Sequence, residues 1–252
     1  MKKLPLALVM SALLGGMPFV AVQSVLATEE AADNAQEEAS SGPRVRRTMT
    51  LREIVFEKLE EAQQAADAGN FDEALQTLER LEKRKRNSYE RAMTHNMYAY
   101  VYSTQENYAA AIPEYAKVIE IDNAPDSLKQ TTRYTLAKLY MLQERYAESL
   151  ATINEWMSQS DKINADAYMF RAQVQYQQEE YELAGDDIAT AISMREEAGS
   201  RVTESWLLLQ RAVMFQLKDY DGLAETLEKL VATYSKSEYW MQLAAVYNEL
   251  GR

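Results

Sequence analysis

An aromatic residue recurs along most of this chain, and its spacing constrains the fold more than any other feature. The aromatics lie at intervals of 37, 38, 35 and 39 residues, at Phe71, Tyr108, Tyr146, Tyr181 and Tyr220. Small residues follow three positions later at Ala74, Ala111, Ser149 and Ala184, with Leu223 in the fifth unit. Larger apolar residues come four positions after those, at Leu78, Tyr115, Ile153, Ile188 and Leu227. This spacing is helical, and repeated units of this size bury their apolar faces only by stacking on one another.

Composition agrees with a helical repeat. Glycine (8) and proline (5) are scarce among the 252 residues, which favours long helices with short connections. An ordinary helical bundle would share the amphipathic pattern, but it has no reason to repeat small and aromatic residues in phase.

The first half of each unit carries a motif of its own. The clearest examples are Leu136-Ala137-x-x-Tyr140 and Trp240-x-x-Leu243-Ala244-x-x-Tyr247-x-x-x-Gly251. Together with the recurring aromatics, these residues resemble the tetratricopeptide repeat, although Lys58 and Ala65 depart from it in the first unit. The resemblance implies an all-α right-handed superhelix, an α-solenoid of about five helical hairpins plus one extra first helix, over residues 50–252. It also implies that small residues of the first helices lie at close contacts, namely Ala62, Ala99, Ala137, Ala172 and Ala244.

Both ends of the repeat region show signals. Thr50 and Glu53 are spaced as a capping box, which predicts the start of the first helix. The last helix either caps the array with a polar face or continues into a further unit. Trp240, Met241 and Leu243 are too apolar for a cap, so we expect the array to be truncated at residue 252.

The N-terminal segment predicts export. Lys2 and Lys3 precede an uncharged stretch, and Val25 and Ala27 place small residues before a cleavage point. We interpret residues 1–27 as a signal peptide and residues 28–49 as a disordered acidic tether. An uncleaved membrane anchor is the alternative.

Charge restricts the partners. The formal charge of −12 disfavours nucleic acid and anionic lipid, so protein partners are expected and membrane association only through them. The basic run from Lys83 to Arg86 goes against this trend. It is interpreted as stabilisation of a helix C-terminus or as a docking patch for an acidic partner.

Few residues could support catalysis. His95 is the single histidine and there is no cysteine, so no metal cluster or usual nucleophile–base pair can form. Asp186 and Asp187 are adjacent and would point in different directions on a helix, so they are interpreted as a solvated face. We expect a protein that is not an enzyme and needs no cofactor or metal.

The tetratricopeptide resemblance implies a concave groove lined by the first helices. Its register gives candidate protein-binding residues, namely Asn96, Tyr100, Tyr134, Lys138, Met141, Met169, Gln173, Tyr176 and Phe215. Tyrosine, methionine and amide side chains suit adaptable binding of a helix or extended peptide. Some of these side chains could instead pack between repeats. Of the basic set that clamps C-terminal carboxylates in some relatives, only Asn96 and Lys138 are partial matches.

These features predict a periplasmic scaffold or adaptor that binds protein partners in a cell-envelope complex. The acidic tether and the stretches Thr132–Tyr140 and Tyr239–Gly251 are similar to tetratricopeptide proteins associated with TonB-type energy-transduction systems. An outer-membrane or cell-wall assembly factor is one alternative, and a non-catalytic part of a longer enzyme is another.

Export makes a direct prediction. If residues 1–27 are a signal peptide, cleavage follows Ala27 and N-terminal sequencing of the mature protein begins at Thr28. A full-length product recovered from the cytosol would contradict it.

Overall fold

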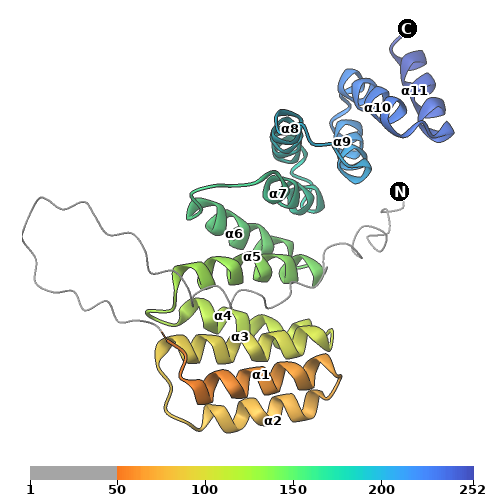
Figure 1. The fold of residues 1–252 in the computed structure, drawn as a ribbon. Coiled ribbons are helices and arrows are strands. Elements are labelled where there is room, and N and C mark those ends of the chain that lie inside the picture. Colours follow the sequence, from red (N-terminus) through yellow and green to blue (C-terminus); the bar gives the residue numbers. More distant parts are fainter. Residues whose placement is uncertain (1–49) are drawn as a thin grey trace, which may run out of the picture. The chain divides into compact units, whose positions relative to one another are not determined.

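The structure, a computed structural model, describes residues 50–252. The predicted signal peptide and tether therefore lie outside the described residues. Residues 50–252 form eleven α-helices joined by short connections (Figure 1). Their bounds are α1 Glu53–Asp67, α2 Phe71–Glu82, α3 Ser88–Thr104, α4 Tyr108–Glu120, α5 Asp126–Leu142, α6 Tyr146–Ser158, α7 Ala165–Gln177, α8 Tyr181–Glu197, α9 Glu204–Leu217, α10 Tyr220–Tyr234 and α11 Ser237–Glu249.

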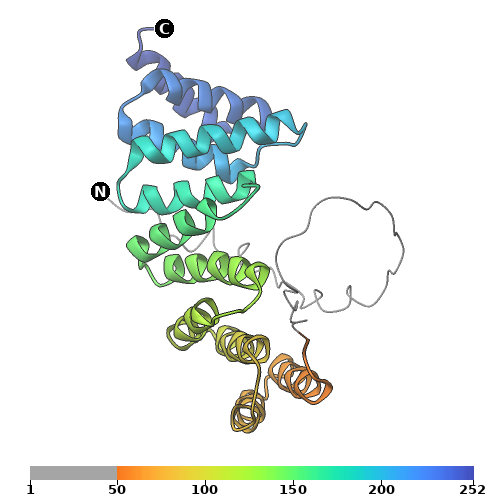
Figure 2. The ribbon, with the colours of Figure 1, turned by 90° about the vertical axis from the view of Figure 1, so that its left-hand side faces the viewer.

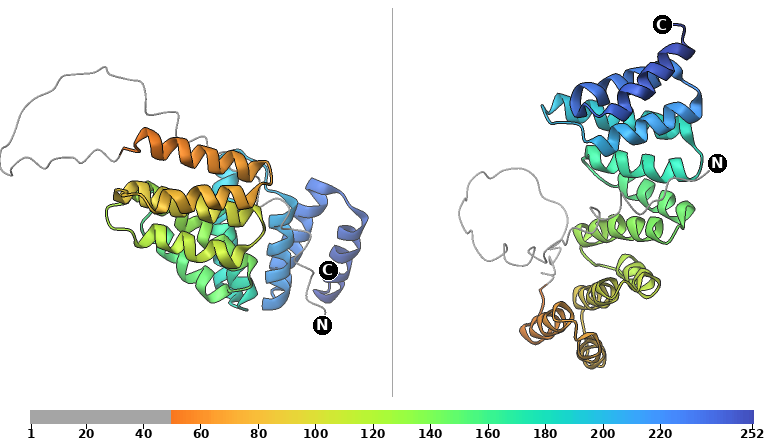
Figure 3. Two further views of the ribbon diagram at one scale, coloured as in Figure 1. Left: turned by 90° about the horizontal axis from the view of Figure 1, so that it is seen from below. Right: turned by 90° about the vertical axis from the view of Figure 1, so that its right-hand side faces the viewer.

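The helices pair into consecutive hairpins. Each odd-numbered helix from α1 to α9 packs against the even-numbered helix that follows it, and each even-numbered helix packs against the next odd-numbered one. Direct contacts also join α1 to α3 and α7 to α9. Successive hairpins turn relative to one another. In Figure 1, α1 to α3 lie across the view and α8 is seen nearly end-on, whereas in Figure 2 α1 to α3 are nearly end-on and α8 lies across the view. Figure 3 shows the same array from two other directions. The expected all-α superhelical array of five hairpins and one extra helix is confirmed.

The recurring aromatics mark the second helices. Each of the five is the first residue of its helix, from Phe71 in α2 to Tyr220 in α10. The small residues predicted at close contacts are buried, except Ala244. The Ser149 hydroxyl donates to the Ala137 carbonyl at 2.7 Å, so α5 and α6 approach closely at these two positions. Ala244 is exposed because no second helix pairs with α11 within residues 50–252.

The turn inside each hairpin has one geometry. The residue two positions before the aromatic has positive φ in all five turns, at Gly69, Glu106, Glu144, Glu179 and Lys218. The next residue donates its amide to the carbonyl five positions back, as Arg145 does to Tyr140 at 2.8 Å. This is the Schellman motif, which satisfies the last carbonyls of a helix. Glycine adopts this left-handed conformation without steric cost, whereas the other residues in these turns do not.

The predicted capping box at Thr50 is wrong. Helix α1 begins at Glu53, its N-cap is Arg52, and no side chain caps it. Instead, Arg52 turns to the second hairpin and bonds the buried Glu90 carboxylate through its backbone amide at 3.1 Å and its Nε at 2.7 Å. A true capping box lies there, between Asn87 and Glu90 at the start of α3. The bonds from Arg52 and the Asn87 amide outweigh burial and lower the pKa of Glu90 to about 2.

The final helix keeps an apolar surface. Trp240 is 57% exposed and Met241 is 67% exposed, whereas Tyr239 and Leu243 on the other side of α11 are buried. Within residues 50–252, no helix combines the length and the apolar character needed to cross a membrane.

The hairpin turns yield a stability prediction. Glu144 has a φ of 56°, so Glu144→Gly should stabilise the protein by about 0.5–1 kcal/mol, because glycine removes the steric cost of the left-handed conformation. Urea unfolding midpoints measure the effect. The control is Gln143→Gly one residue earlier, where φ is −91° and glycine should destabilise the protein. Equal shifts in the two variants would contradict this explanation.

Candidate functional site

The nine candidate residues lie on the first helices of four hairpins. Asn96 and Tyr100 belong to α3, while Phe215 belongs to α9. Helix α5 carries Tyr134, Lys138 and Met141, and α7 carries Met169, Gln173 and Tyr176. We call these nine residues the A-helix surface.

Burial divides the A-helix surface into three groups. Met141 and Met169 are only 4% and 2% exposed, and each belongs to an apolar core. Phe215 is 58% exposed, and the remaining six residues are half-buried. In this conformation the two methionines therefore pack between helices and present almost no surface to a ligand. Phe215 presents the most aromatic surface of the nine.

Tyr134 is the centre of an aromatic cluster. Its ring lies 4.8 Å from Trp156 and 5.9 Å from Phe170, measured between ring centroids. The Lys138 ammonium sits 4.4 Å from the centroid of the Tyr134 ring, within the range of a cation–π interaction. Burial raises the pKa of Tyr134 to about 12 and lowers the pKa of Lys138. The cluster thus holds a partly desolvated cation against an aromatic face.

Charged and aromatic groups continue from this cluster along the array. The Asp166 carboxylate at the start of α7 opposes the lowering of the Lys138 pKa, and it pairs with Arg195 at 2.9 Å. The Arg195 guanidinium in turn lies 4.3 Å from the centroid of the Trp206 ring in α9. Sequence reasoning missed Arg195 and Trp206, because their proximity depends on how α8 meets α7 and α9.

The other residues of the A-helix surface differ in how they are held. The Tyr100 hydroxyl donates to Asp67 of the preceding hairpin, and the Tyr176 ring packs edge-on against Tyr181 at 5.5 Å. Among the described residues, no hydrogen bond uses the side-chain amide of Asn96 or Gln173. These two amides are available to bond the backbone of a bound peptide.

Residues considered for catalysis have structural partners. His95 Nδ1 lies 2.7 Å from a carboxylate oxygen of Glu114, and both side chains are mostly buried between α3 and α4. Asp186 is exposed, but the prediction of a solvated face is wrong for Asp187. Asp187 is 6% exposed and accepts two hydrogen bonds from Arg171, at 2.6 and 2.7 Å. In residues 50–252 no cluster of His, Asp or Glu has the arrangement of a metal site.

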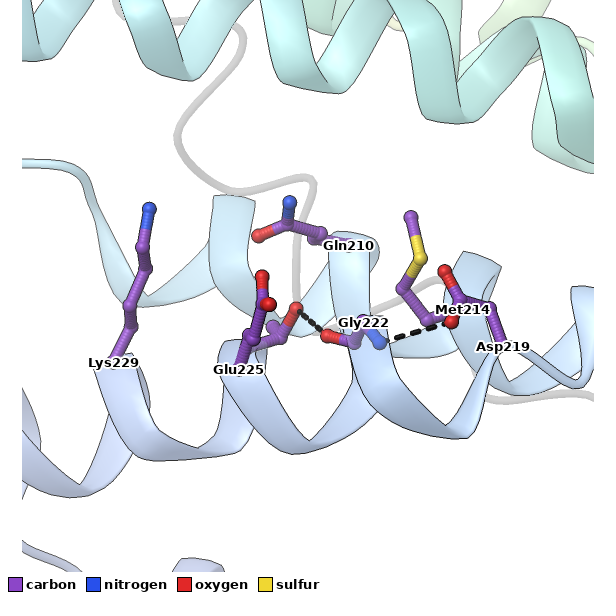
Figure 4. A pocket seen from close by; sticks show the side chains of 7 residues that line it. Gln210, Met214, Asp219, Gly222, Glu225 and Lys229 are labelled. Atoms are coloured by element: carbon purple, nitrogen blue, oxygen red, sulfur yellow. Dashed lines mark hydrogen bonds between the residues drawn. The ribbon is translucent and has the colours of Figure 1, made fainter.

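A small polar pocket that shares no residue with the A-helix surface lies between α9 and α10 (Figure 4). Its lining is Gln210, Met214, Asp219, Gly222, Glu225, Thr226 and Lys229. A side chain at Gly222 would place its Cβ 2.5 Å from an Asp219 carboxylate oxygen, so the Asp219 side chain would have to shift to accommodate it. The Gly222 amide donates to Asp219 at 2.9 Å, and Thr226 donates to the Gly222 carbonyl at 2.8 Å. These bonds stabilise the start of α10, where the turn of the fifth hairpin ends.

Helical hairpins stacked one on the next define a class of protein, the helical-repeat scaffold. A family profile described as tetratricopeptide repeat matches residues 59–127 and 134–199, more than half of the chain. The chain belongs to the tetratricopeptide repeat family. No curated protein matches the sequence.

Solved structures share the fold at low sequence identity. The protein is similar to MamA, with 19% identity and a TM-score of 0.54 over 64% of this chain and 84% of MamA. A tetratricopeptide repeat protein from Parabacteroides merdae gives 16% identity and a TM-score of 0.59 over 78% of this chain and 73% of its own. YrrB, described as having an unusual peptide-binding site, gives 16% identity and a TM-score of 0.51 over 64% of this chain and 78% of YrrB.

The aromatic cluster predicts how a variant at Tyr134 behaves. Tyr134→Ala removes the ring contacts with Trp156 and Phe170 and should destabilise the protein by about 2 kcal/mol, less than the loss of a fully buried aromatic. Tyr134→Phe keeps the ring and should unfold near the wild-type midpoint. Thermal melts of the two variants measure this, and an unchanged midpoint for Tyr134→Ala would show that the ring adds nothing to the core.

Proposed function

We propose that this protein is a periplasmic scaffold that holds a protein segment against the A-helix surface within a cell-envelope complex. A TonB-type transport system is the first such complex to test. The general role in protein–protein interaction follows from the tetratricopeptide repeat family. The location and the complex rest on the N-terminal sequence pattern and on the resemblance described above.

One observation supports the A-helix surface most strongly. Phe215 is a large aromatic on a first helix, and it is 58% exposed instead of packed between repeats. Large aromatic side chains at protein interfaces contribute more to binding than most contacts around them. The unbonded amides of Asn96 and Gln173 lie on other first helices, where they would bond the backbone of the same peptide at other points. The peptide-binding site named for YrrB is a precedent within the same fold.

The bound segment is expected to be held more by apolar contacts than by charge. The surface contains three tyrosines and Phe215 but one cation, Lys138, and that cation already lies over the Tyr134 ring. Exposed charge pairs add little to affinity, whereas a desolvated aromatic anchor adds more. Binding should therefore depend weakly on salt.

The test uses a partner captured from envelope extract and then purified. Phe215→Ala should weaken binding of that partner at least about tenfold, because an anchoring aromatic is lost. The thermal midpoint should stay near wild type, since the side chain is mostly exposed. Titration calorimetry or surface plasmon resonance measures the affinity.

A matched control is available on a second helix. Leu183 in α8 is 52% exposed, so Leu183→Ala removes a similar amount of exposed apolar surface away from the A-helix surface. Its affinity should equal that of the wild type. If Leu183→Ala weakens binding and Phe215→Ala does not, the partner binds on the second helices and the proposal fails.

A further inference from the structure

The connection between α2 and α3, together with the first turn of α3, carries an unusual concentration of positive charge. Residues 83–91 contain five cations, at Lys83, Arg84, Lys85, Arg86 and Arg91, and one carboxylate, Glu90. Glu90 is buried and already paired with Arg52. No salt bridge among residues 50–252 uses any of the five cations. The positive charge of this connection is therefore left without a neutralising partner in the described part of the chain.

Stabilisation of the α2 C-terminus explains only one of these cations. The Arg86 Nη2 donates to the Glu82 carbonyl at 3.3 Å, as a cation at a helix end should. The side chains of Lys83, Arg84 and Lys85 make no hydrogen bond to α2 within residues 50–252 and are exposed. Hydrogen bonding to the last carbonyls of α2 therefore leaves these three side chains free.

The connection is held in place rather than left loose. The Arg52 Nη2 donates to the Lys85 carbonyl at 2.5 Å, and the Arg84 amide donates to the Leu81 carbonyl at 3.0 Å. Asn87 then caps α3 through the capping box with Glu90. Arg86 keeps its Nε and Nη1 buried beneath the connection without a hydrogen-bond partner. A positioned group of cations binds an anion at lower entropic cost than a mobile one.

We propose that Lys83, Arg84 and Lys85 form a docking surface for an acidic peptide segment of a partner protein. Carboxylates of such a segment would form charge-assisted hydrogen bonds with the three exposed cations. This surface lies on the connection between two hairpins and shares no residue with the A-helix surface, so it is independent of the function proposed above.

The charge of the whole molecule selects a peptide over other polyanions. The chain carries −12 overall, and Glu79 and Glu82 in α2 flank the cations. A nucleic acid or an anionic bilayer would extend beyond the patch and meet this negative surface. A short acidic segment fits the positive surface and ends before the negative one.

The experiment measures binding of a short fluorescein-labelled poly-glutamate peptide to the full chain by fluorescence anisotropy. At low salt the wild type should bind, and the triple variant Lys83→Gln/Arg84→Gln/Lys85→Gln should bind about fivefold or more weakly. Raising the salt to about 0.2 M should weaken wild-type binding, because the Debye length falls below about 10 Å.

Two controls separate this site from general charge effects and from the A-helix surface. The control variant Lys162→Gln/Lys218→Gln removes two exposed cations outside the proposed docking surface. It is compared with Lys83→Gln/Arg84→Gln, which removes two cations of that surface and so has the same net charge. The first pair should leave binding unchanged, and so should Phe215→Ala. Equal losses in the two pairs would overturn the proposal. So would absence of peptide binding at low salt, or tighter binding of single-stranded DNA or phosphatidylserine vesicles than of the peptide.

Discussion

The close approach of two small residues in each of the first four hairpins is the contact on which the rest of the structure depends. The Ser149 hydroxyl reaches the Ala137 carbonyl at 2.7 Å, which is possible because neither residue has a side chain that would keep the two helices apart. Ala62 with Ala74 and Ala172 with Ala184 occupy the same positions in other hairpins and are fully buried. Close-packed hairpins then present apolar faces that only the next hairpin can cover, so the array builds by stacking neighbours.

Polar contacts strengthen this arrangement at positions that also recur. Thr77 donates to Glu61 in the first hairpin, and Arg171 donates to Asp187 in the fourth, with the same sixteen-residue separation. Arg171 also donates to Asn154 at 3.1 Å, which links the fourth hairpin to the third. Burial of Asp187 is therefore tolerated because its charge is paired and hydrogen-bonded. Since contacts join mainly adjacent elements, a substitution in one hairpin should act on its neighbours first.

The residues of the A-helix surface differ in how far the neighbouring helices cover them. Its half-buried tyrosines are fixed by packing, as Tyr134 is by Trp156, while Phe215 stays exposed. Register along the chain was enough to place all nine residues on first helices. It could not separate Met141 and Met169, which pack in the core, from Phe215, because equivalent positions differ in how the neighbouring helix covers them.

Local patterns in the sequence were sufficient to predict the number of hairpins and, except for Ala244, the small residues at the helix contacts. These features are local, because they follow from helical periodicity and from the geometry of a short turn. The bond between Arg52, the N-cap of α1, and Glu90 emerged only from the packed helices. So did the burial of Asp187 against Arg171. The contact between the Arg195 guanidinium and the Trp206 ring also depends on that packing. Such pairings join residues from different helices, and a single sequence carries no signal for side chains that meet only after the helices have packed.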